Sequence, residues 1–306
     1  MREARTIVGL GEVLWDLLPQ GKQLGGAPAN FAYMASLLGH RGIAASRIGG
    51  DELGKELTQK LAGLGLEESF LQSDGAHATG TAAVHVDGQG QAAFEITKNV
   101  AWDFLEWTPA WERLAGEADA VCFGSLAQRS RQSRETIRKF LSASREGALR
   151  IFDVNLRQKF YSPEILSESL RLANVVKLND AELPIVAEQL HLEHDEERAA
   201  AESLRRAFRL RLVCVTRGNR GSLLVSESGS DEHAGFPVRV ADSVGAGDAF
   251  TAALAHHLLK GSPLRVINDA ANRLGAWVAS HAGATPQADA ALAEILAGTY
   301  KPGSRS

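Results

Sequence analysis

Short apolar runs that alternate with helical patterns constrain the fold of this chain more than any other feature. Six such runs lie at residues 6–10, 43–48, 120–123, 149–152, 175–178 and 212–216. A segment with helical periodicity separates each run from the next. Strands that alternate with helices are typical of a parallel sheet. The sequence therefore predicts an α/β fold built on a mainly parallel sheet.

One stretch interrupts this alternation. Residues 79–86 and 91–96 are rich in β-forming side chains and flank the turn-forming segment 87–90. We predict a hairpin that projects from the main domain as an insertion. No repeat, low-complexity block or long linker occurs in the sequence, so residues 1–300 are expected to form one domain. Residues 301–306 are expected to be a flexible tail.

Composition excludes several classes of partner. The 33 basic and 37 acidic residues leave a net charge of −4 without a long basic run, so no nucleic-acid partner is expected. Neither a leader nor an apolar run long enough for a membrane span occurs, so we expect a cytoplasmic protein without a membrane partner. Cys122 and Cys214 lie in apolar runs and are expected to be reduced core thiols.

The segment Asp242-Ser-Val-Gly-Ala-Gly-Asp248 is a candidate phosphate loop. An apolar stretch at 236–240, expected to be a strand, precedes it, and helix-forming residues 249–259 follow it. Gly245 and Gly247 allow backbone N–H groups to approach an anion at a helix N-terminus. Asp248 would repel phosphate unless it takes a proton from an attacking hydroxyl. The same residues could also form an ordinary strand-to-helix turn with a first-turn acid.

Polar residues follow several of the predicted strands. The segments that carry them are Asp153-Val-Asn-Leu-Arg157, Asn179-Asp-Ala-Glu182 and Thr216-Arg-Gly218. Ligands of open α/β sheets bind beyond the carboxyl ends of the strands. Each segment could instead be a helix cap, and Asn179 with Glu182 resembles a capping box. Their convergence on the edge that carries the glycine loop favours a ligand site.

A second glycine-rich segment, Gly25-Gly-Ala-Pro-Ala-Asn30, lies near the N-terminus before a helical stretch at 31–38. Paired glycines permit close approach, and the Asn30 amide both donates and accepts hydrogen bonds, as recognition of a polyol requires. Asp16 is a candidate acceptor for sugar hydroxyls. Asn30 could also be a surface residue of the helix, and Asp16 a loop acid.

Taken together and in order, these motifs resemble those of the ribokinase-like carbohydrate kinases, also called the phosphofructokinase B family. The motifs are Gly25-Gly-Ala-Pro-Ala-Asn30, Arg47-Ile-Gly-Gly-Asp51, Asp153-Val-Asn-Leu-Arg157, Asn179-Asp-Ala-Glu182 and Asp242–Asp248. The first of them and Phe123-Gly-Ser-Leu126 are most similar to the fructokinase branch. The resemblance covers nearly the whole chain and implies a doubly wound sheet with a β lid, formed from segments around 12–24 and 79–100.

The resemblance also implies roles for individual residues. Asp248 corresponds to the general base, and the amides of Gly245, Ala246 and Gly247 to the anion hole. The residues implied in sugar binding are Asp16, Gly25, Gly26, Asn30 and Arg157. Those implied in nucleotide binding are Asn179, Glu182, Thr216, Gly218, Gly221 and Asn272, and Glu182 would also organise Mg²⁺ through water. Those implied in a monovalent-cation site are Asp242, Val244 and Gly283, with K⁺ as the candidate ion.

Two of these residues keep a simpler interpretation. Asn272 could be an exposed residue of a helix at 265–280, and Arg157 could form a surface salt bridge. The family pattern also differs after Asp153, because fructokinases commonly have Pro after this Asp and Trp after the Arg, where this chain has Val154 and Gln158. This departure leaves the identity of the sugar open.

The predicted function is an ATP-dependent kinase that phosphorylates a primary hydroxyl of a free sugar, with fructose as the leading substrate. Ribose, 2-keto-3-deoxygluconate or another sugar of the same family is the first alternative. A nucleotide-dependent oxidoreductase is a second class, but Gly9-Leu-Gly11 lacks the third glycine of the dinucleotide fingerprint. A non-catalytic sugar-binding protein is a third. The hairpin is expected to close over the sugar, and its apolar residues Val84, Val86 and Phe94 to pair with a second subunit in a homodimer.

Overall fold

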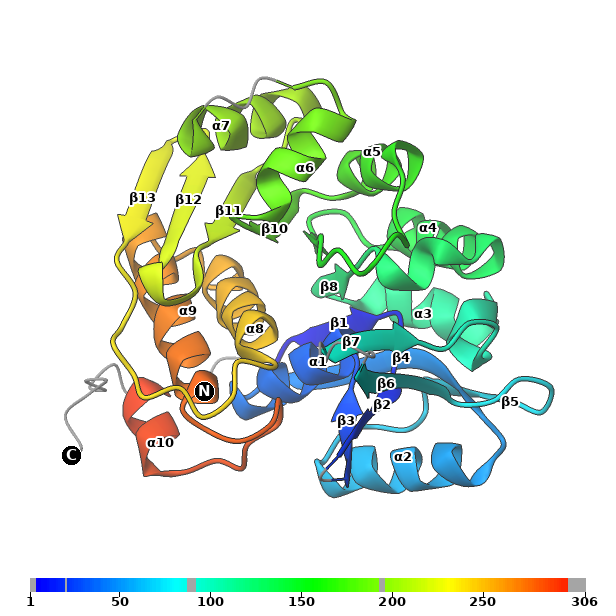
Figure 1. The fold of residues 1–306 in the computed structure, drawn as a ribbon. Coiled ribbons are helices and arrows are strands. Elements are labelled where there is room, and N and C mark those ends of the chain that lie inside the picture. The colour runs from blue at the N-terminus through cyan, green and yellow to red at the C-terminus, as the bar shows by residue number, and fades with distance from the viewer. Residues whose placement is uncertain (1–3, 20, 87–91, 193–195, 297–306) are drawn as a thin grey trace.

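The computed structural model describes residues 4–19, 21–86, 92–192 and 196–296, and for residues 84–86 and 92–94 it describes the backbone (Figure 1). Within these residues the main sheet has nine strands in the order β13-β12-β11-β10-β9-β8-β1-β4-β5. Its strands are β1 (Thr6–Leu10), β4 (Arg41–Gly49), β5 (Leu71–Asp74), β8 (Ala120–Phe123), β9 (Leu149–Asp153), β10 (Val175–Asn179), β11 (Leu212–Thr216), β12 (Ser222–Ser226) and β13 (Gly229–His233). The strands from β11 to β5 run parallel, whereas β12 and β13 pair antiparallel at one edge. The predicted mainly parallel sheet and its six strands are confirmed.

Helices cover both faces of this sheet, as a doubly wound fold requires. They are α1 (Ala27–Leu37), α2 (Glu52–Gly63), α3 (Pro109–Glu117), α4 (Arg131–Ala143), α5 (Pro163–Leu172), α6 (Glu182–Gln189), α7 (Glu197–Phe208), α8 (Ala246–Leu259), α9 (Leu264–Ala279) and α10 (Ala290–Leu296). Short 3₁₀ helices are η1 (Ala101–Phe104), η2 (Leu126–Arg129) and η3 (Gly218–Arg220). Neighbouring residues of a strand point to opposite faces. Phe152 of β9 accordingly packs in the core that α3–α7 share, and Ile151 in the core that α1, α2, α8 and α9 share.

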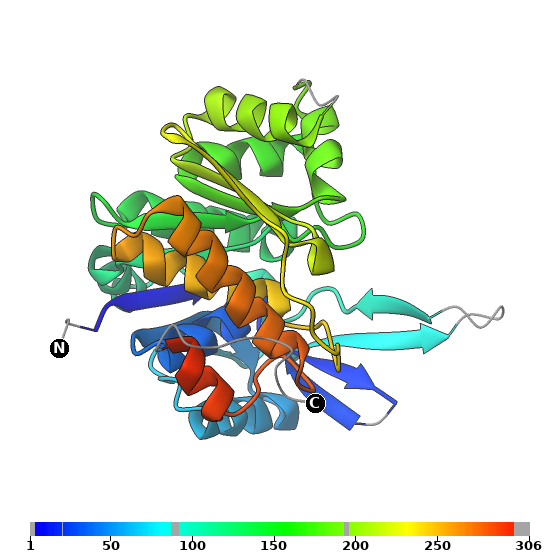
Figure 2. The same ribbon diagram turned by 90° about the vertical axis from the view of Figure 1, so that its left-hand side faces the viewer.

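A second, smaller sheet stands apart from the main one. Within the described residues it has the order β3-β2-β6-β7, with β2 (Leu14–Leu18), β3 (Gly21–Gly25), β6 (Gly80–Val86) and β7 (Ala92–Ile96). Figure 2 shows these strands extending beyond the main body of the molecule. The predicted hairpin at 79–96 is confirmed as the antiparallel pair of β6 and β7. Its turn at 87–91 and the side chains of Val84, Val86 and Phe94 lie outside the described residues, as does the predicted tail at 301–306.

Some element boundaries differ from the prediction. Residues 236–240 form no strand, because Pro237 has no N–H to donate to a ladder and the stretch leaves the edge strand β13 for the surface, where Val240 is 59% exposed. Helices α1 and α8 begin earlier than predicted, at Ala27 and Ala246, so the residues of both glycine-rich segments form the first turns themselves.

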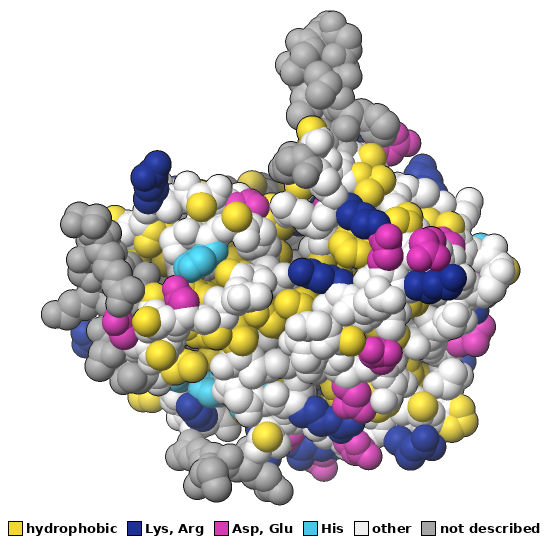
Figure 3. All heavy atoms as spheres, turned by 90° about the horizontal axis from the view of Figure 1, so that it is seen from below, with side chains coloured by type: hydrophobic (Ala, Val, Ile, Leu, Met, Phe, Trp, Pro, Cys, Tyr) yellow, Lys and Arg dark blue, Asp and Glu magenta, His cyan; other side chains and the backbone are white. Residues whose placement is uncertain are grey.

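The surface agrees with the near balance of charges in the sequence. On the face seen in Figure 3, Lys and Arg side chains are interspersed with those of Asp and Glu. Among the described residues, no helix is both long and apolar enough to cross a membrane. Cys122 and Cys214 are buried free thiols, as predicted.

Candidate active site

The glycine loop ends at the N-terminus of α8. Gly245 precedes the helix with φ 79° in the left-handed region, and a Cβ at this position would lie 2.5 Å from Cβ of Ala284. Only glycine fits this turn without strain. The N–H groups of Gly247 and Asp248 have no hydrogen-bond partner among the described residues. The first turn of α8 therefore presents the unpaired amides that an anion site requires.

Asp248 lies directly beside the second glycine-rich segment. Asn30 Nδ2 donates a hydrogen bond to Asp248 Oδ2 over 2.8 Å, although the two residues are 218 positions apart in the chain. The Asn30 side chain is buried, and its Oδ1 has no partner within the described part of the chain. The structure thus brings the predicted base and a predicted sugar contact together. Asn30 is not the surface residue that the simpler interpretation required.

Asp16 also belongs to this region. It lies on β2 opposite β3, and a Cβ on Gly25 would come within 2.4 Å of Asp16 Oδ2. Burial raises the pKa of Asp16 to about 6, and the charge of Arg157 opposes this rise. Arg157 itself is exposed and donates to the carbonyl oxygen of Leu156. Its positive charge lowers the pKa of both Asp16 and Asp248.

The pKa of Asp248 lies above that of an exposed Asp although the residue is in the first turn of a helix. Burial raises the pKa of Asp248 to about 6, and the nearby charge of Asp153 adds to the rise. The hydrogen bond from Asn30 and the positive charges of Lys177 and Arg157 lower the pKa but do not outweigh burial. Above pH 7 the carboxylate form still dominates, and its basicity is greater than that of an exposed Asp.

A buried ion pair between Lys177 and Asp153, which the sequence analysis missed, packs against the glycine loop. Lys177 Nζ lies 3.0 and 3.2 Å from the carboxylate oxygens of Asp153, and Thr251 Oγ1 donates to the same carboxylate over 3.1 Å. The pKa of Lys177 is raised, because the carboxylates of Asp153, Glu182 and Asp248 outweigh the effect of its burial. A Cβ on Gly247 would lie 3.0 Å from Lys177 Nζ, so the ammonium group sits against the loop. The sequence feature that could have indicated this ion pair is a lysine inside the apolar run of β10.

Asn179 and Glu182 form the reciprocal contacts of a capping box. Asn179 Oδ1 accepts from the N–H of Glu182 over 2.8 Å, and Glu182 Oε2 accepts from the N–H of Asn179 over 2.8 Å. Glu182 Oε1 accepts from the N–H of Leu156 over 2.7 Å. Both carboxylate oxygens therefore hold the strand ends β9 and β10 in place. No group of three or more potential metal-binding side chains occurs among the described residues, so the protein alone forms no closed metal cage.

The remaining predicted nucleotide residues gather around the end of β11. Thr216 ends this strand, Gly218 begins η3, and Gly221 has φ 81° with no room for a Cβ, which would lie 1.9 Å from the carbonyl oxygen of His233. Asn272 donates to Ser222 Oγ over 2.7 Å and to the carbonyl oxygen of Asn268 over 2.8 Å. Asn272 is only 8% exposed, so its interpretation as an exposed helix residue is wrong.

The three residues of the predicted monovalent-cation site also lie together. Asp242 Oδ1 accepts from the N–H of Val244 over 3.0 Å, and Asp242 Oδ2 accepts from the N–H of Gly283 over 3.1 Å. The carboxylate thereby links the loop before α8 to the loop after α9. A carboxylate oxygen is a ligand type that fits a hard cation.

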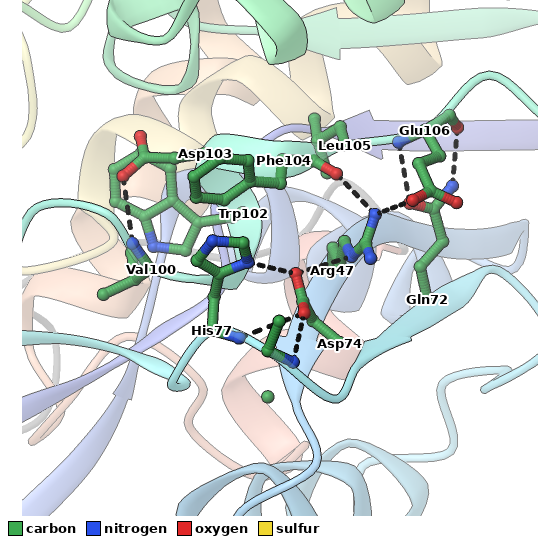
Figure 4. A network of polar contacts seen from close by, with 12 residues as sticks. Arg47, Gln72, Asp74, His77, Val100, Trp102, Asp103, Phe104, Leu105 and Glu106 are labelled. Atoms are coloured by element: carbon green, nitrogen blue, oxygen red, sulfur yellow. Dashed lines mark hydrogen bonds and ion pairs between the residues drawn. The ribbon is translucent and has the colours of Figure 1, made fainter.

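A polar network fixes the segments next to the small sheet (Figure 4). Arg47 lies 3.0 Å from Asp74 and donates to the carbonyl oxygen of Phe104 over 2.6 Å. Asp74 accepts in turn from the backbone and the ring of His77, which stacks on Phe104. These contacts join the ends of β4 and β5 to η1. The Arg47 side chain of the sequence motif therefore joins β4 to β5 and η1.

Comparisons with known proteins agree with this geometry. The family model described as pfkB family carbohydrate kinase matches residues 19–291. Fructokinase from Escherichia coli is 32% identical over 295 residues, which cover 90% of this chain and 93% of that protein. The crystal structure of fructokinase from Xylella fastidiosa with bound ATP has a TM-score of 0.81 at 25% identity, covering 95% of this chain and 97% of its own. A fructokinase double mutant from Vibrio cholerae, solved with fructose, ADP and a potassium ion, has a TM-score of 0.78 at 26% identity, covering 96% and 98%.

These similarities confirm the resemblance that the motifs indicated, including the ribokinase-like fold with its separate small sheet. They favour the kinase over the oxidoreductase and the non-catalytic binding protein. The chain therefore belongs to the pfkB family of carbohydrate kinases and is a sugar kinase.

Proposed function

We propose that this sugar kinase is a fructokinase, which transfers the γ-phosphate of ATP to a primary hydroxyl of fructose. The observation that carries the proposal is the 2.8 Å contact between Asp248 at the first turn of α8 and Asn30 of the double-glycine segment. It joins a candidate base and a candidate anion site to a polyol-binding segment. The similarity to fructokinases from three bacteria supports fructose as the acceptor.

The proposed mechanism uses Asp248 as the general base. Its carboxylate accepts the proton of the attacking hydroxyl, the new O–P bond forms, the bond between the γ-phosphorus and the bridging oxygen breaks, and ADP leaves. Negative charge collects on the phosphoryl oxygens in the loose transition state, so fixed donors matter more than strong basicity. We assign these donors to the amides of Gly245, Ala246 and Gly247 at the start of α8, of which the Ala246 N–H would have to exchange its 3.4 Å bond to the carbonyl oxygen of Ser243 for one to phosphate. Lys177 adds positive charge behind the loop.

The acceptor residues would orient the sugar for this attack. We assign Asp16, Gly25, Gly26 and Asn30 to its hydroxyl groups, with Arg157 facing the sugar or the transferred phosphate. Asp16 and the unpartnered Oδ1 of Asn30 can accept hydrogen bonds from hydroxyls. Because both lie within buried or half-buried surroundings, such bonds would be shielded from competing water.

The nucleotide would lie along the ends of β10 and β11. We assign Asn179, Glu182, Thr216, Gly218, Gly221 and Asn272 to this side. Mg²⁺ commonly keeps several waters and binds through phosphate oxygens. Glu182, whose two carboxylate oxygens already accept backbone N–H groups, would therefore act on the ion through water. When bound, Mg²⁺ would neutralise charge on the phosphates. Asp242 with the backbone at Val244 and Gly283 would hold K⁺.

The small sheet would act as a lid on the single domain that we propose for residues 1–300. Closure over the sugar would exclude water and limit hydrolysis of ATP. Pairing of two such sheets in a homodimer stays a prediction, and light scattering over a concentration series would test it. A species that remains monomeric at every concentration would contradict it.

Release of ADP across a panel of sugars tests the proposal. Fructose, ribose and 2-keto-3-deoxygluconate would be compared with Mg²⁺, each with and without K⁺. We expect the highest kcat/KM with fructose, and stimulation by K⁺. A higher kcat/KM with ribose or with the sugar acid would replace fructose by that substrate and leave the kinase assignment intact.

A further inference from the structure

Among the buried polar atoms that have no hydrogen-bond partner within the described residues are one acceptor and one donor from charged side chains. They are Oε2 of Glu12 and Nη1 of Arg129. Glu12 is 2% exposed, and the side chain of Arg129 is 7% exposed. Buried polar atoms are nearly always hydrogen-bonded, because an unpaired one keeps the full cost of losing its water. An acceptor and a donor that are both left unpaired indicate a place for a polar ligand group.

Glu12 lies on the same edge of the sheet as the acceptor residues. It follows the end of β1 by two positions, and a Cβ on Gly26 would lie 2.5 Å from its carbonyl oxygen. Burial raises the pKa of Glu12 to about 7, Arg157 and Arg129 lower it, and Asp248 raises it. The backbone of Glu12 therefore packs against the double-glycine segment of the proposed sugar site.

The guanidinium of Arg129 is held in place by hydrogen bonds from two of its nitrogens, and the third, Nη1, has no partner among the described residues. Its Nε and Nη2 each donate to Asp103 over 2.8 Å, and Nη2 also donates to the carbonyl oxygen of Thr97 over 2.5 Å. The guanidinium lies 4.0 Å from the ring centre of Trp102, which Figure 4 shows next to Asp103. These contacts fix the direction of Nη1, so its position needs no further ordering when a ligand arrives.

The two side chains come from segments that pack against each other. A Cβ on Gly11, the neighbour of Glu12, would lie 3.4 Å from Cβ of Ala127 in η2, the helix that ends at Arg129. Thr97, the backbone partner of Arg129, directly follows β7 of the small sheet. Glu12 and Arg129 thus lie on segments that pack against each other where the small sheet joins the main one.

We propose that Glu12 and Arg129 form a hydroxyl-binding subsite for the acceptor sugar, in addition to the contacts assigned above. The inference rests on the proposed function in that it requires a sugar in this cleft. A hydroxyl group both donates and accepts, so it can donate to Oε2 of Glu12 and accept from Nη1 of Arg129. An apolar group would leave both atoms unpaired, and an anionic group would face the carboxylate. The subsite therefore recognises one neutral hydroxyl.

Kinetics of Glu12→Gln with deoxy sugars test this subsite. We expect KM for fructose to rise about tenfold with KM for ATP unchanged, because an amide supplies a weaker acceptor than a carboxylate. In the unchanged protein, one fructose analogue that lacks a single hydroxyl should show a similar rise in KM. With Glu12→Gln, KM for this analogue should equal KM for fructose, because the carboxylate that binds the hydroxyl in the unchanged protein is absent.

A matched control separates this effect from the loss of a buried charge. Asp119 is also a buried acid, but it accepts hydrogen bonds from Thr6 and Arg5 at the opposite end of β1. Asp119→Asn should leave every KM unchanged. If Glu12→Gln does not fold, Glu12→Asp keeps the charge but withdraws the carboxylate by one carbon, and we expect the same loss of discrimination.

The outcomes distinguish the subsite from the proposed function. If KM of the variant stays within about twofold for fructose and all deoxy penalties persist, the subsite is wrong, and a water molecule occupies the gap. If the unchanged protein prefers ribose, the fructokinase proposal is wrong, and the subsite is then scored with deoxyribose analogues in the same way.

Discussion

The polar side chains on the acceptor side and on the nucleotide side of the site differ in how fully they are hydrogen-bonded. We call Glu12, Asp16, Asn30 and Asp248 the acceptor cluster, and Asn179, Glu182, Asp242 and Asn272 the nucleotide cluster. In the acceptor cluster, two side chains have an oxygen without a partner, and burial raises the pKa of all three acids. In the nucleotide cluster, every one of these side chains bonds to backbone or to a buried neighbour.

This difference indicates how each side would recognise its ligand. Side chains with unpaired, partly desolvated atoms can bind hydroxyl groups directly, at a cost to the stability of the free protein. Side chains that are already satisfied instead hold loops in shape, and the loops present backbone groups to a phosphate. Substitutions should therefore affect catalysis on the acceptor side, and stability on the nucleotide side.

The largest expected effect comes from Asp248→Asn. The amide keeps the shape of the side chain and can bond to Asn30, but it cannot accept the hydroxyl proton. We expect kcat to fall by about 10³-fold, within the range typical of a lost general base, and ADP affinity to stay within about twofold. Steady-state ADP release and calorimetric titration with ADP measure the two quantities. Near-normal turnover of the purified variant would refute the base assignment.

Lys177→Met should have the largest effect on stability. It leaves the carboxylate of Asp153 buried with Thr251 as its remaining side-chain donor, and breaking such a pair costs about 3–5 kcal/mol. Urea denaturation measures the loss. The double variant with Asp153→Asn should regain part of it, because no uncompensated charge remains. Arg131→Ala, which breaks the exposed pair with Glu135, serves as the control and should leave stability unchanged.

How far the sequence predicted these two clusters depends on the kind of signal each residue gives. Gly25, Gly245 and Asp248 were found because a glycine turn before a helix is a local pattern. Lys177 was missed because one lysine inside an apolar strand looks like an interruption until its partner, 24 positions earlier, is known. The fold followed from the alternation of apolar runs, whereas the raised pKa of Asp248 depends on burial that no local pattern encodes.

The dependence of kcat on pH should show the raised pKa of the acceptor cluster. A base must be ionised to act, and the pKa of Asp248 is about 6 in the folded protein, so activity should be full above pH 7 and fall about tenfold per unit below pH 6. Rates at saturating sugar between about pH 5 and 8 measure this limb. Asp16→Asn is the control, because the limb should persist when the other acid with a pKa of about 6 is removed. A profile that stays flat down to about pH 5 would contradict Asp248 as the titrating base.

The smallest effect, and the sharpest test of the contrast between the clusters, is expected for Asn272→Ala. The Asn272 amide nitrogen already donates to Ser222 Oγ, to the carbonyl oxygen of Asn268 and to Asn268 Oδ1, so little donor capacity remains for an adenine ring. Loss of these bonds should lower the free energy of unfolding by about 1–2 kcal/mol, while KM for ATP changes by less than about threefold. Urea denaturation and ADP release at varied ATP give both values. A rise in KM for ATP of more than about tenfold without a change in stability would instead make Asn272 a direct nucleotide contact, and the nucleotide cluster would then recognise its ligand through side chains, as the acceptor cluster does.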